Sequence, residues 1–443
     1  MFMTYRAFGR PPRSRTCGLR VFPVPVLAVL AVLGQGLAIG TTVSAQASSA
    51  QVPQAWQLQH VPSPPGSDLE SVSCPTVTDC VAVGAEETTS GPALSVVESW
   101  SPRGWSLTKT PQPSLIAGGA SLVSVSCASG ASCVAVGGDG TFSSDGYQFS
   151  DVLEAGTWHV MPTAKVNAAI PGSVLLSSVS CWEPTGCDAV GLYTSRGPGG
   201  AGEPVVETFN GKTWSLAKTP AFADGASLDS ISCLPATVPD LCVAVGSKFS
   251  STSVPQTSLP LVELGNGSSF QVVAVPAPPG AQTSTLTSVS CPQPSSCVAV
   301  GTDQAGSDSP SRSFSEVEEL HRWGVVPPAP PPADDGQDFE LSGVSCPVTI
   351  SACVAVGAAG TMGAGATGSR TLAEAEELSP GSGRSPGTSL GEWHVTATHA
   401  PQLSGFEAVS CPLSYSLNTV TCTAVGYFQP GQHRRTQAMA ART

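Results

Sequence analysis

The stretch LVSVSC at residues 122–127, followed after a short loop by CVAVG at residues 133–137, decides the fold of this chain. In the first part, apolar and small polar residues alternate, which is typical of a strand with one buried face. The second part is almost continuously apolar and predicts a strand covered on both faces. The two parts therefore predict an antiparallel hairpin whose second strand ends at Gly137.

The same pattern occurs seven times along the chain. The first cysteines of successive copies are 52 to 65 residues apart, so one structural unit is repeated. Each copy contains a glycine equivalent to Gly137 directly after its second apolar run. The seven cysteine pairs are Cys74/Cys80, Cys127/Cys133, Cys181/Cys187, Cys233/Cys242, Cys291/Cys297, Cys346/Cys353 and Cys411/Cys422.

Each repeat continues with two more predicted strands. The third strand follows a longer polar loop, as at residues 94–100, 205–209 and 261–264. The fourth strand opens with an aromatic residue and ends near a proline, as at residues 105–111. The aromatic residues in this position are Trp56, Trp105, Trp158, Trp214, Phe270, Trp323 and Trp393.

Trp56 stands before the first cysteine pair, so the chain begins with a fourth strand at about residues 55–61 that has no repeat of its own. The last repeat has room for a third strand near residues 436–441 and then ends. The N-terminal strand would therefore complete the last blade of a ring. We expect an all-β, seven-bladed β-propeller with four-stranded blades, because radial repetition leaves only short, protected sheet edges.

Composition supports this fold class. Glycine and proline, the two weakest helix formers, number 47 and 40 of 443 residues, and charged residues make up 12%. The formal net charge is −13, and removal of the five arginines before residue 21 makes it −18. Such an acidic chain repels phosphate backbones, so nucleic acid is excluded as a partner.

The N-terminal segment has the pattern of a secretion signal. Its five arginines precede an apolar stretch at residues 21–33, and Val43-Ser44-Ala45 satisfies the small-x-small cleavage rule. We expect residues 1–45 to be a signal peptide and residues 46–443 a single propeller domain. A retained anchor is the alternative and the one route to a membrane. Cleavage would remove Cys17 and leave an even number of cysteines, as expected of an exported protein.

The tandem pattern resembles the secreted bacterial β-propeller repeats in which Ser-Val-Ser-Cys…Cys-Val-Ala-Val-Gly alternates with Val-Glu…Trp segments. The resemblance covers residues 55 to about 441, which is nearly all of the expected mature chain. It implies the propeller fold and export. It implies little about function, because that group is largely uncharacterised.

The cysteines of each pair flank a strand-to-strand turn, so they can face each other across the hairpin and form a disulfide. Structural zinc needs two close cysteine knuckles brought together, whereas these pairs lie one per repeat. Redox catalysis favours Cys-x-x-Cys, which does not occur in this sequence. We therefore interpret all fourteen cysteines as structural staples.

Acidic residues recur in the third strands. We interpret them as a repeated surface or inter-blade hydrogen-bonding position, and the alternative is a ring of carboxylates that binds cations. The six histidines are scattered, and the sequence nominates no catalytic, cofactor-binding or metal-binding residue. The recurring acids are Glu98, Glu154, Glu207, Glu263, Glu319 and Glu377.

Loop lengths give the functional hypothesis. The loops between second and third strands are long, varied and polar, and they share a face with the blade connectors, whereas the cysteine turns on the opposite face are short. We expect a secreted or envelope-associated, monomeric, non-catalytic module that binds an extracellular protein or glycan through this long-loop face. The alternative is a polysaccharide hydrolase or lyase with acids in the axial pocket. The loops span residues 85–92, 138–150, 192–204, 247–258, 302–314 and 358–370.

Overall fold

A computed structural model divides the chain into two units, Met1–Ser48 and Ser49–Thr443. The expected signal peptide at residues 1–45 lies outside the described residues. Within the described ranges, no helix combines the length and the apolar character that a membrane crossing requires. The structure describes residues 56–113, 119–138, 148–166, 172–195, 202–234, 242–250, 257–306, 309–319, 321–326, 338–360, 370–377, 392–396, 398, 401, 403–414, 419–431 and 435–443.

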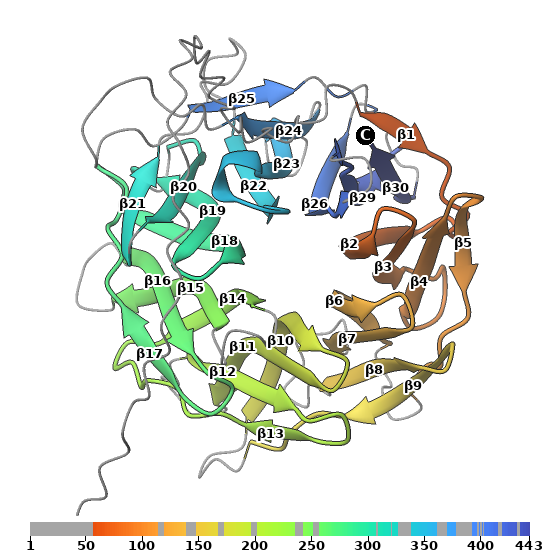
Figure 1. Cartoon of the computed structure of the whole chain (residues 1–443), viewed down its shortest axis with the longest axis horizontal. Helices are drawn as coiled ribbons and strands as arrows, with labels where there is room; N and C mark the ends of the chain where they lie inside the picture. Colours follow the sequence, from red (N-terminus) through yellow and green to blue (C-terminus); the bar gives the residue numbers. More distant parts are fainter. Residues whose placement is uncertain are drawn as a thin grey trace, which may run out of the picture. The chain divides into compact units, whose positions relative to one another are not determined.

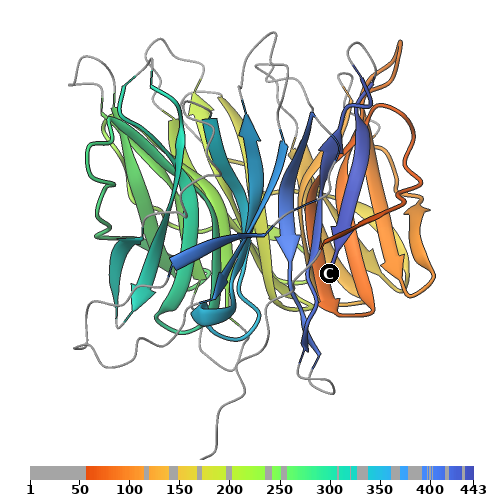
Figure 2. The same cartoon turned by 90° about the horizontal axis from the view of Figure 1, so that it is seen from above.

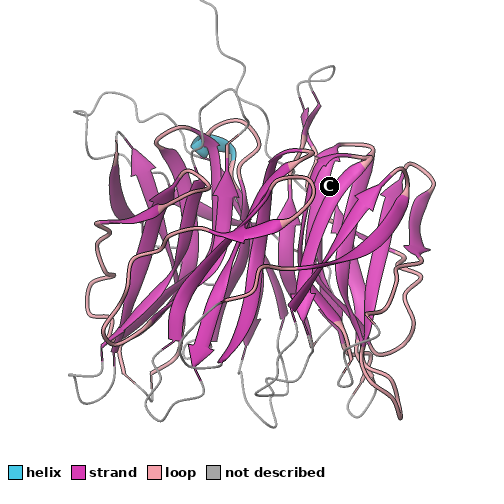
Figure 3. Cartoon of the chain, turned by 90° about the horizontal axis from the view of Figure 1, so that it is seen from below, coloured by secondary structure: helices cyan, strands magenta, loops and turns pink. Residues whose placement is uncertain are grey.

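The second unit is built from strands, and its one described helical segment is the 3-10 turn Ile350–Ala352 (Figure 3). Repeats are numbered here by their cysteine pairs, and repeats 1 to 6 each supply four strands. Repeats 1 to 3 hold β2 (Ser67–Thr76), β3 (Asp79–Glu86), β4 (Leu94–Ser101), β5 (Gly104–Thr108), β6 (Ser121–Ser129), β7 (Ser132–Gly138), β8 (Gln148–Glu154), β9 (Thr157–Pro162), β10 (Gly172–Glu183), β11 (Gly186–Ser195), β12 (Gly202–Phe209) and β13 (Trp214–Leu216).

Repeats 4 to 6 follow the same order. They hold β14 (Ala226–Cys233), β15 (Cys242–Ser250), β16 (Thr257–Gly265), β17 (Phe270–Val273), β18 (Thr283–Gln293), β19 (Ser296–Gln304), β20 (Arg312–Glu319), β21 (Arg322–Val326), β22 (Asp338–Ser345), β23 (Val354–Gly360), β24 (Arg370–Glu377) and β25 (Glu392–Thr396). Repeat 7 holds β26 (Ser404–Ser410), β29 (Thr423–Phe428) and β30 (Gln437–Arg442), with a small hairpin of β27 (Leu413–Ser414) and β28 (Thr419–Val420) in its cysteine turn.

The four strands of a repeat pair antiparallel in chain order. Repeats 4 and 5 share one sheet, because Ser258 of β16 forms a parallel pair with Thr283 of β18. The first strands contact one another in the order β2, β6, β10, β14, β18, β22, β26 and back to β2. They lie around a common centre, with β5, β9, β13, β17 and β21 on the outside (Figure 1). The fold is a β-propeller.

The core lies between neighbouring repeats. Val83 and Val97 of repeat 1, for example, pack in one buried cluster with Leu122, Phe149 and Trp158 of repeat 2. Another cluster combines residues of repeat 7 with residues of repeat 1. Each sheet therefore buries both faces against its neighbours, which explains the continuous apolar sequence of the second strands.

The chain begins with the expected extra strand. β1 (Gln57–Gln59) directly follows the buried Trp56 and pairs antiparallel with β30, with Gln57 opposite Arg442. β30 itself lies where the sequence predicted the last third strand. In Figure 1, β1 accordingly lies beside the C-terminal strands of repeat 7 and not within repeat 1.

The motif glycine does not end the second strand, contrary to the expectation from the sequence. β7 runs one residue past Gly137, and β11 runs on to Ser195. The glycine is needed because the first strand bulges opposite it, between Leu122 and Ser124, and its backbone comes close. A Cβ on Gly137 would stand 2.9 Å from the Cα of Leu122 and closer still to the carbonyl oxygen of Ser121.

The serine before each first cysteine ties neighbouring repeats together. The Cys127 backbone N–H donates to the Ser73 hydroxyl at 3.0 Å, and the Cys181 N–H donates to Ser126 at 2.9 Å. The Cys74 N–H donates to Ser410 of repeat 7, also at 3.0 Å. Serine hydroxyls thus bridge first strands that do not pair directly. The other four bonds join Cys233 to Ser180, Cys291 to Ser232, Cys346 to Ser290 and Cys411 to Ser345.

Candidate functional site

The fourteen cysteines form seven disulfides in the pairing that the sequence suggested. In repeats 2, 3 and 4 the bonded cysteines are also direct cross-strand partners. The disulfides therefore close the short turns between first and second strands. Figure 2, a view turned by 90°, shows the strands running between two sets of loops. The bonds are Cys74–Cys80, Cys127–Cys133, Cys181–Cys187, Cys233–Cys242, Cys291–Cys297, Cys346–Cys353 and Cys411–Cys422.

In the described part of the chain, these cysteines are bonded in pairs and lie away from the two pockets described below. The second cysteine of every pair is at most 2% exposed, and each lies in the apolar core between repeats. No cysteine lines either of the two pockets described below. The disulfides therefore stabilise the fold, and the candidate site lies elsewhere. The buried second cysteines are Cys80, Cys133, Cys187, Cys242, Cys297, Cys353 and Cys422.

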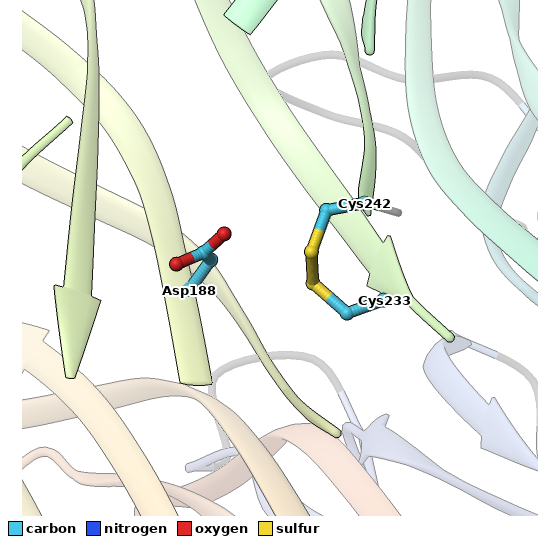
Figure 4. Close-up of side chains that lie close together, drawn as sticks. All are labelled: Asp188, Cys233 and Cys242. Carbon is cyan, nitrogen blue, oxygen red and sulfur yellow. A yellow bond between two sulfur atoms is a disulfide. The ribbon is translucent and has the colours of Figure 1, made fainter. Parts of the chain in front are cut away.

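One disulfide lies beside a buried carboxyl group. Oxygen and sulfur atoms of Asp188, Cys233 and Cys242 lie within 4.8 Å of one another, which resembles a ligand cluster (Figure 4). The two sulfur atoms are bonded to each other, so neither is the thiolate that a metal ion would need. This cluster is a contact between repeats 3 and 4.

The recurring third-strand acids need one correction. The equivalent position is the residue opposite the central alanine of Cys-x-Ala-Val-Gly, and Glu154, Glu319 and Glu377 do not occupy it. Glu154 and Glu319 are exposed residues at hairpin ends. From the sequence alone these three glutamates are easily misaligned, because each stands at the end of its third strand, just before the fourth strand. The residues at the equivalent position are Glu98, Asp151, Glu207, Glu263, Glu316 and Glu374, with Ala441 in repeat 7.

Five of these acids, Glu98, Asp151, Glu207, Glu263 and Glu316, are buried. Glu98 accepts a hydrogen bond from the Ser63 hydroxyl at 2.7 Å, Asp151 accepts one from Thr110 at 2.6 Å, and Glu207 accepts one from the Ala164 N–H at 2.7 Å. Each donor lies in the connector that follows the fourth strand of the neighbouring repeat. For Glu98 and Glu207, the interpretation as inter-blade hydrogen-bonding positions is therefore confirmed. Asp151, which the sequence did not nominate, makes the same kind of contact, and none of the three lies at the surface.

Glu263 and Glu316 differ from the other acids. Both are fully buried, and among the described residues no donor reaches either of their carboxyl groups. Burial raises the pKa of Glu263 to about 7 and that of Glu316 to about 8. At Glu316 the neighbouring connector carries Val275 where the connector of repeat 1 carries Thr110, which removes the donor. Both side chains are therefore held mainly as neutral acids below pH 7.

A separate group of acids lies at the centre of the ring that the first strands form. One pocket of about 190 Å³ is lined by residues from all seven first strands. Its lining includes the extra residue of the β-bulge in each strand, which the bulge turns toward the centre. The seven bulge residues are Glu70, Val123, Ser177, Asp229, Thr287, Ser342 and Glu407.

Three of these seven residues are acids. Burial raises the pKa of Glu70 to about 7, and the carboxyl groups of Asp68 and Glu407 raise it further. Burial raises the pKa of Asp229 to about 6, against a hydrogen bond from Ser227. Burial and the charges of Asp68 and Glu340 raise the pKa of Glu407. No basic side chain contributes to these shifts, so the carboxyl groups of the pocket keep their protons to a higher pH than exposed carboxyl groups do.

Tyr427 extends this acidic region. It lies on β29 opposite Gly405 of β26, and its ring atoms would be about 3.2 Å from a Cβ on that glycine. Burial raises its pKa, as do the charges of Glu407, Glu340, Glu70 and Asp68. Asp68 and Glu340 precede the bulges of β2 and β22, on the side where the connectors enter. The acidic region therefore continues from the pocket toward the connector side.

The sequence suggested acids in an axial pocket as an alternative, but it did not identify these residues. The signal was available, because each bulge residue is the fourth residue before the first cysteine of its repeat. Only Glu70, Asp229 and Glu407 are acidic at that place, so no periodic pattern marked them. Of the long loops that the sequence favoured as a binding face, the parts 139–147, 196–201, 251–256, 307–308 and 361–369 lie outside the described residues, whereas 85–92 and most of 302–314 are described.

Comparisons with known proteins give no family. No model of a known protein family matches the chain, and no curated protein does either. Solved structures that are similar to it include the WD40 propeller domain of Doa1, with 10% identity, 88% of this chain and 97% of that chain covered, and a TM-score of 0.45. A Penicillium chrysogenum α-L-arabinanase has 9% identity, coverage of 88% and 98%, and a TM-score of 0.39. A Dyadobacter fermentans protein of unknown function has 11% identity, coverage of 72% and 93%, and a TM-score of 0.42. At these values the likenesses carry no argument about function.

Proposed function

We propose that residues 46–443 form a seven-bladed β-propeller whose last blade is completed by the N-terminal strand. Three observations support the proposal: the pairing of β1 with β30, the cycle of contacts among seven first strands, and the serine–cysteine bonds that include Ser410 to Cys74. The Arg442 guanidinium adds a contact between the last and first repeats, because it lies 3.4 Å from the ring centre of Trp100.

We further propose that the chain is an exported, non-catalytic binding module whose ligand site is the acidic central pocket. The observation that carries the proposal is that the bulge residues of all seven first strands line one cavity and that three of them are carboxyl groups. Seven disulfides are consistent with an extracellular location.

The chemistry of the pocket favours a hydroxyl-rich ligand such as a glycan. Carboxyl oxygens accept hydrogen bonds from sugar hydroxyls, while the serine and threonine residues of the lining can donate or accept. Sites of this kind combine a concave scaffold with a few convergent polar groups. Asp68, Glu340 and Tyr427 would contact the part of the ligand that extends toward the connector side.

A polysaccharide hydrolase is the second candidate, because Glu70 has a pKa of about 7 and could serve as a general acid. Hydrolysis also needs a second carboxylate that is held ionised. Asp229, whose pKa is about 6, is the candidate for that carboxylate. It lies on β14, which is not a neighbour of β2 in the ring of first strands, so we favour binding over catalysis.

A glycan array probed with the exported protein tests both candidates. We expect binding that is lost in Glu70→Gln and Glu407→Gln and unchanged in Glu154→Gln, an exposed glutamate outside the pocket. Release of reducing ends from an array-positive glycan, abolished in Glu70→Gln, would establish the hydrolase instead. Equal binding by all three variants would contradict a role for the pocket.

A further inference from the structure

The third strand of repeat 7 has an open edge. β30 pairs with β29 along its whole length, from Gln437 to Arg442. On its other side, β1 covers only Ala440, Ala441 and Arg442. The stretch from Gln437 to Met439 therefore has one edge that no strand covers among the described residues.

Repeat 1 shows what such an edge binds. Ser95 and Ala438 hold equivalent positions, because each lies opposite the residue that follows the motif glycine. The Ser95 N–H donates to the Gln112 side-chain oxygen at 3.0 Å, and the Gln112 amide nitrogen donates to the Ser95 carbonyl at 3.1 Å. The N–H and the carbonyl of Ser95 thus both point outward, and one amide side chain forms hydrogen bonds with both of them.

Repeat 3 repeats this arrangement in part. Pro204 occupies the position equivalent to Ser95, and its carbonyl accepts a hydrogen bond from the Thr219 hydroxyl at 3.2 Å. In both repeats the partner comes from the connector that follows the fourth strand. In these two repeats the connector therefore satisfies this edge, and proline is compatible with the fold at this position.

Repeat 7 lacks the residue that would do so. Ser63 is the seventh residue after Trp56, as Gln112 is the seventh after Trp105. The Ser63 side chain is too short to fill the same space, and its hydroxyl donates to Glu98 instead. Among the described residues, nothing bonds to the outward N–H and carbonyl of Ala438.

A groove lies at this place. Its volume is about 410 Å³, and its lining includes Ala438 and Ser63. Leu58, Val61, Phe428 and Met439 give it apolar walls, and no aspartate, glutamate, lysine or arginine lines it among the described residues. Leu58 is 45% exposed, which leaves an apolar surface open to a partner.

We propose that this groove binds an uncharged extended peptide segment of a partner protein as an added strand on β30. The main chain of the peptide would pair with the N–H and carbonyl of Ala438, and an alternate apolar side chain would lie against Leu58 and Phe428. Addition of a strand to an open sheet edge is a general mode of peptide recognition, with affinity from main-chain bonds and selectivity from side-chain pockets.

The test uses a fluorescein-labelled, N-acetylated and C-amidated hexapeptide of alternating threonine and valine, with fluorescence anisotropy as the readout on the full exported chain. We expect saturable binding that Ala438→Pro weakens about tenfold, since proline removes the outward N–H and leaves a peptide carbonyl unpaired. A peptide with its central amides N-methylated should lose affinity to a similar degree.

Leu58→Ala and Leu216→Ala form a matched pair of variants. Leu216 holds the same fourth-strand position in repeat 3 and is 43% exposed, but it does not line the groove. We expect Leu58→Ala to weaken binding severalfold and Leu216→Ala to leave it unchanged. The proposal is overturned if the two variants bind alike, if Ala438→Pro binds as the wild type does, or if no saturable binding occurs at millimolar peptide. None of these outcomes depends on the central pocket.

Discussion

At the scale of single residues, the glycine of Cys-x-Ala-Val-Gly connects the fold with the central pocket. The bulge that presents Glu70, Asp229 or Glu407 to the centre lies directly opposite this glycine. The bulged backbone occupies the space that a side chain would need. The glycine therefore permits the bulge, and the bulge orients the residue that lines the pocket.

Gly137→Ala tests this relation. The new Cβ would overlap the carbonyl oxygen of Ser121, so we expect a loss of roughly 3 kcal/mol in the free energy of unfolding, as for overpacked sites. Gly130→Ala is the control, because its nearest neighbour to a new Cβ is 3.6 Å away. Urea unfolding followed by tryptophan fluorescence measures both. Equal stability of the two variants would contradict the steric explanation.

A second residue-scale feature is the indole of the fourth-strand tryptophan. Trp214 donates to the Ser150 hydroxyl and Trp393 donates to Ser315, each at 2.9 Å and each to the preceding repeat. The Trp105 indole N–H is buried without a partner among the described residues. The position equivalent to Ser150 is Ala440 in repeat 7, which packs in the same cluster as Trp105.

Ala440→Ser should supply the missing acceptor. We expect the free energy of unfolding to rise by about 1 kcal/mol, the usual net value of such a bond. Ser150→Ala is the reciprocal variant and should lower it by a similar amount or more, since it leaves the Trp214 N–H unpaired. Thermal unfolding by circular dichroism is the measurement. A destabilised Ala440→Ser variant would show that Trp105 does not face residue 440 as the packing indicates.

At the scale of elements, the disulfides cross-link hairpins whose strands contain glycines and other small residues. Each closes a turn of 5 to 10 residues between its two cysteines. A short cross-link restricts the unfolded chain only modestly, so no single disulfide dominates the stability. Their regular placement, one in each first hairpin, suggests that they fix the register of the strand carrying the bulge.

Removal of one disulfide should therefore have a limited effect that depends on loop length. We expect Cys127→Ala with Cys133→Ala to lose roughly 2 kcal/mol, and Cys411→Ala with Cys422→Ala to lose slightly more because its loop is longer. Chemical denaturation of the oxidised variants measures the losses. Intact mass before and after reduction checks the pairing, and free thiols in protein exported under oxidising conditions would contradict it.

At the scale of the whole molecule, buried carboxyl groups determine how stability depends on pH. The folded-state pKa is raised above the unfolded value for Glu70, Asp151, Glu207, Asp229, Glu263 and Glu316, to values between about 6 and about 8. As pH rises through the ordinary values of 3.8 for aspartate and 4.5 for glutamate, the unfolded chain releases these protons while the folded chain retains them. Stability therefore falls with rising pH, until the folded groups are also ionised.

The expected result is a melting temperature that is higher at pH 5 than at pH 8. Glu263→Gln and Glu316→Gln should flatten this dependence, because a neutral amide replaces an acid that must lose its buried proton. Glu154→Gln, at an exposed position, should leave the slope unchanged. Differential scanning calorimetry across this range is the measurement, and a melting temperature that rises toward pH 8 would contradict the assignment.

The sequence by itself determined the local and periodic features of the protein. The alternation in residues 122–127 and the apolar run in 133–137 predicted the first hairpin, and the cysteine spacing predicted the disulfide partners. Trp56 predicted the extra N-terminal strand. These features depend on the period of the apolar side chains and on the length of the turns, and both patterns recur in every repeat of the sequence.

Only the tertiary structure decided which residues meet between repeats. It placed Asp151, and not Glu154, at the buried acid position, because the strand register sets Asp151 opposite Ala135. It also brought Glu70, Asp229 and Glu407 together from repeats 1, 4 and 7, and it left the edge at Ala438 open. The physical reason is that both sites combine residues that lie far apart in the sequence, and these residues meet only when the strands of distant repeats come together.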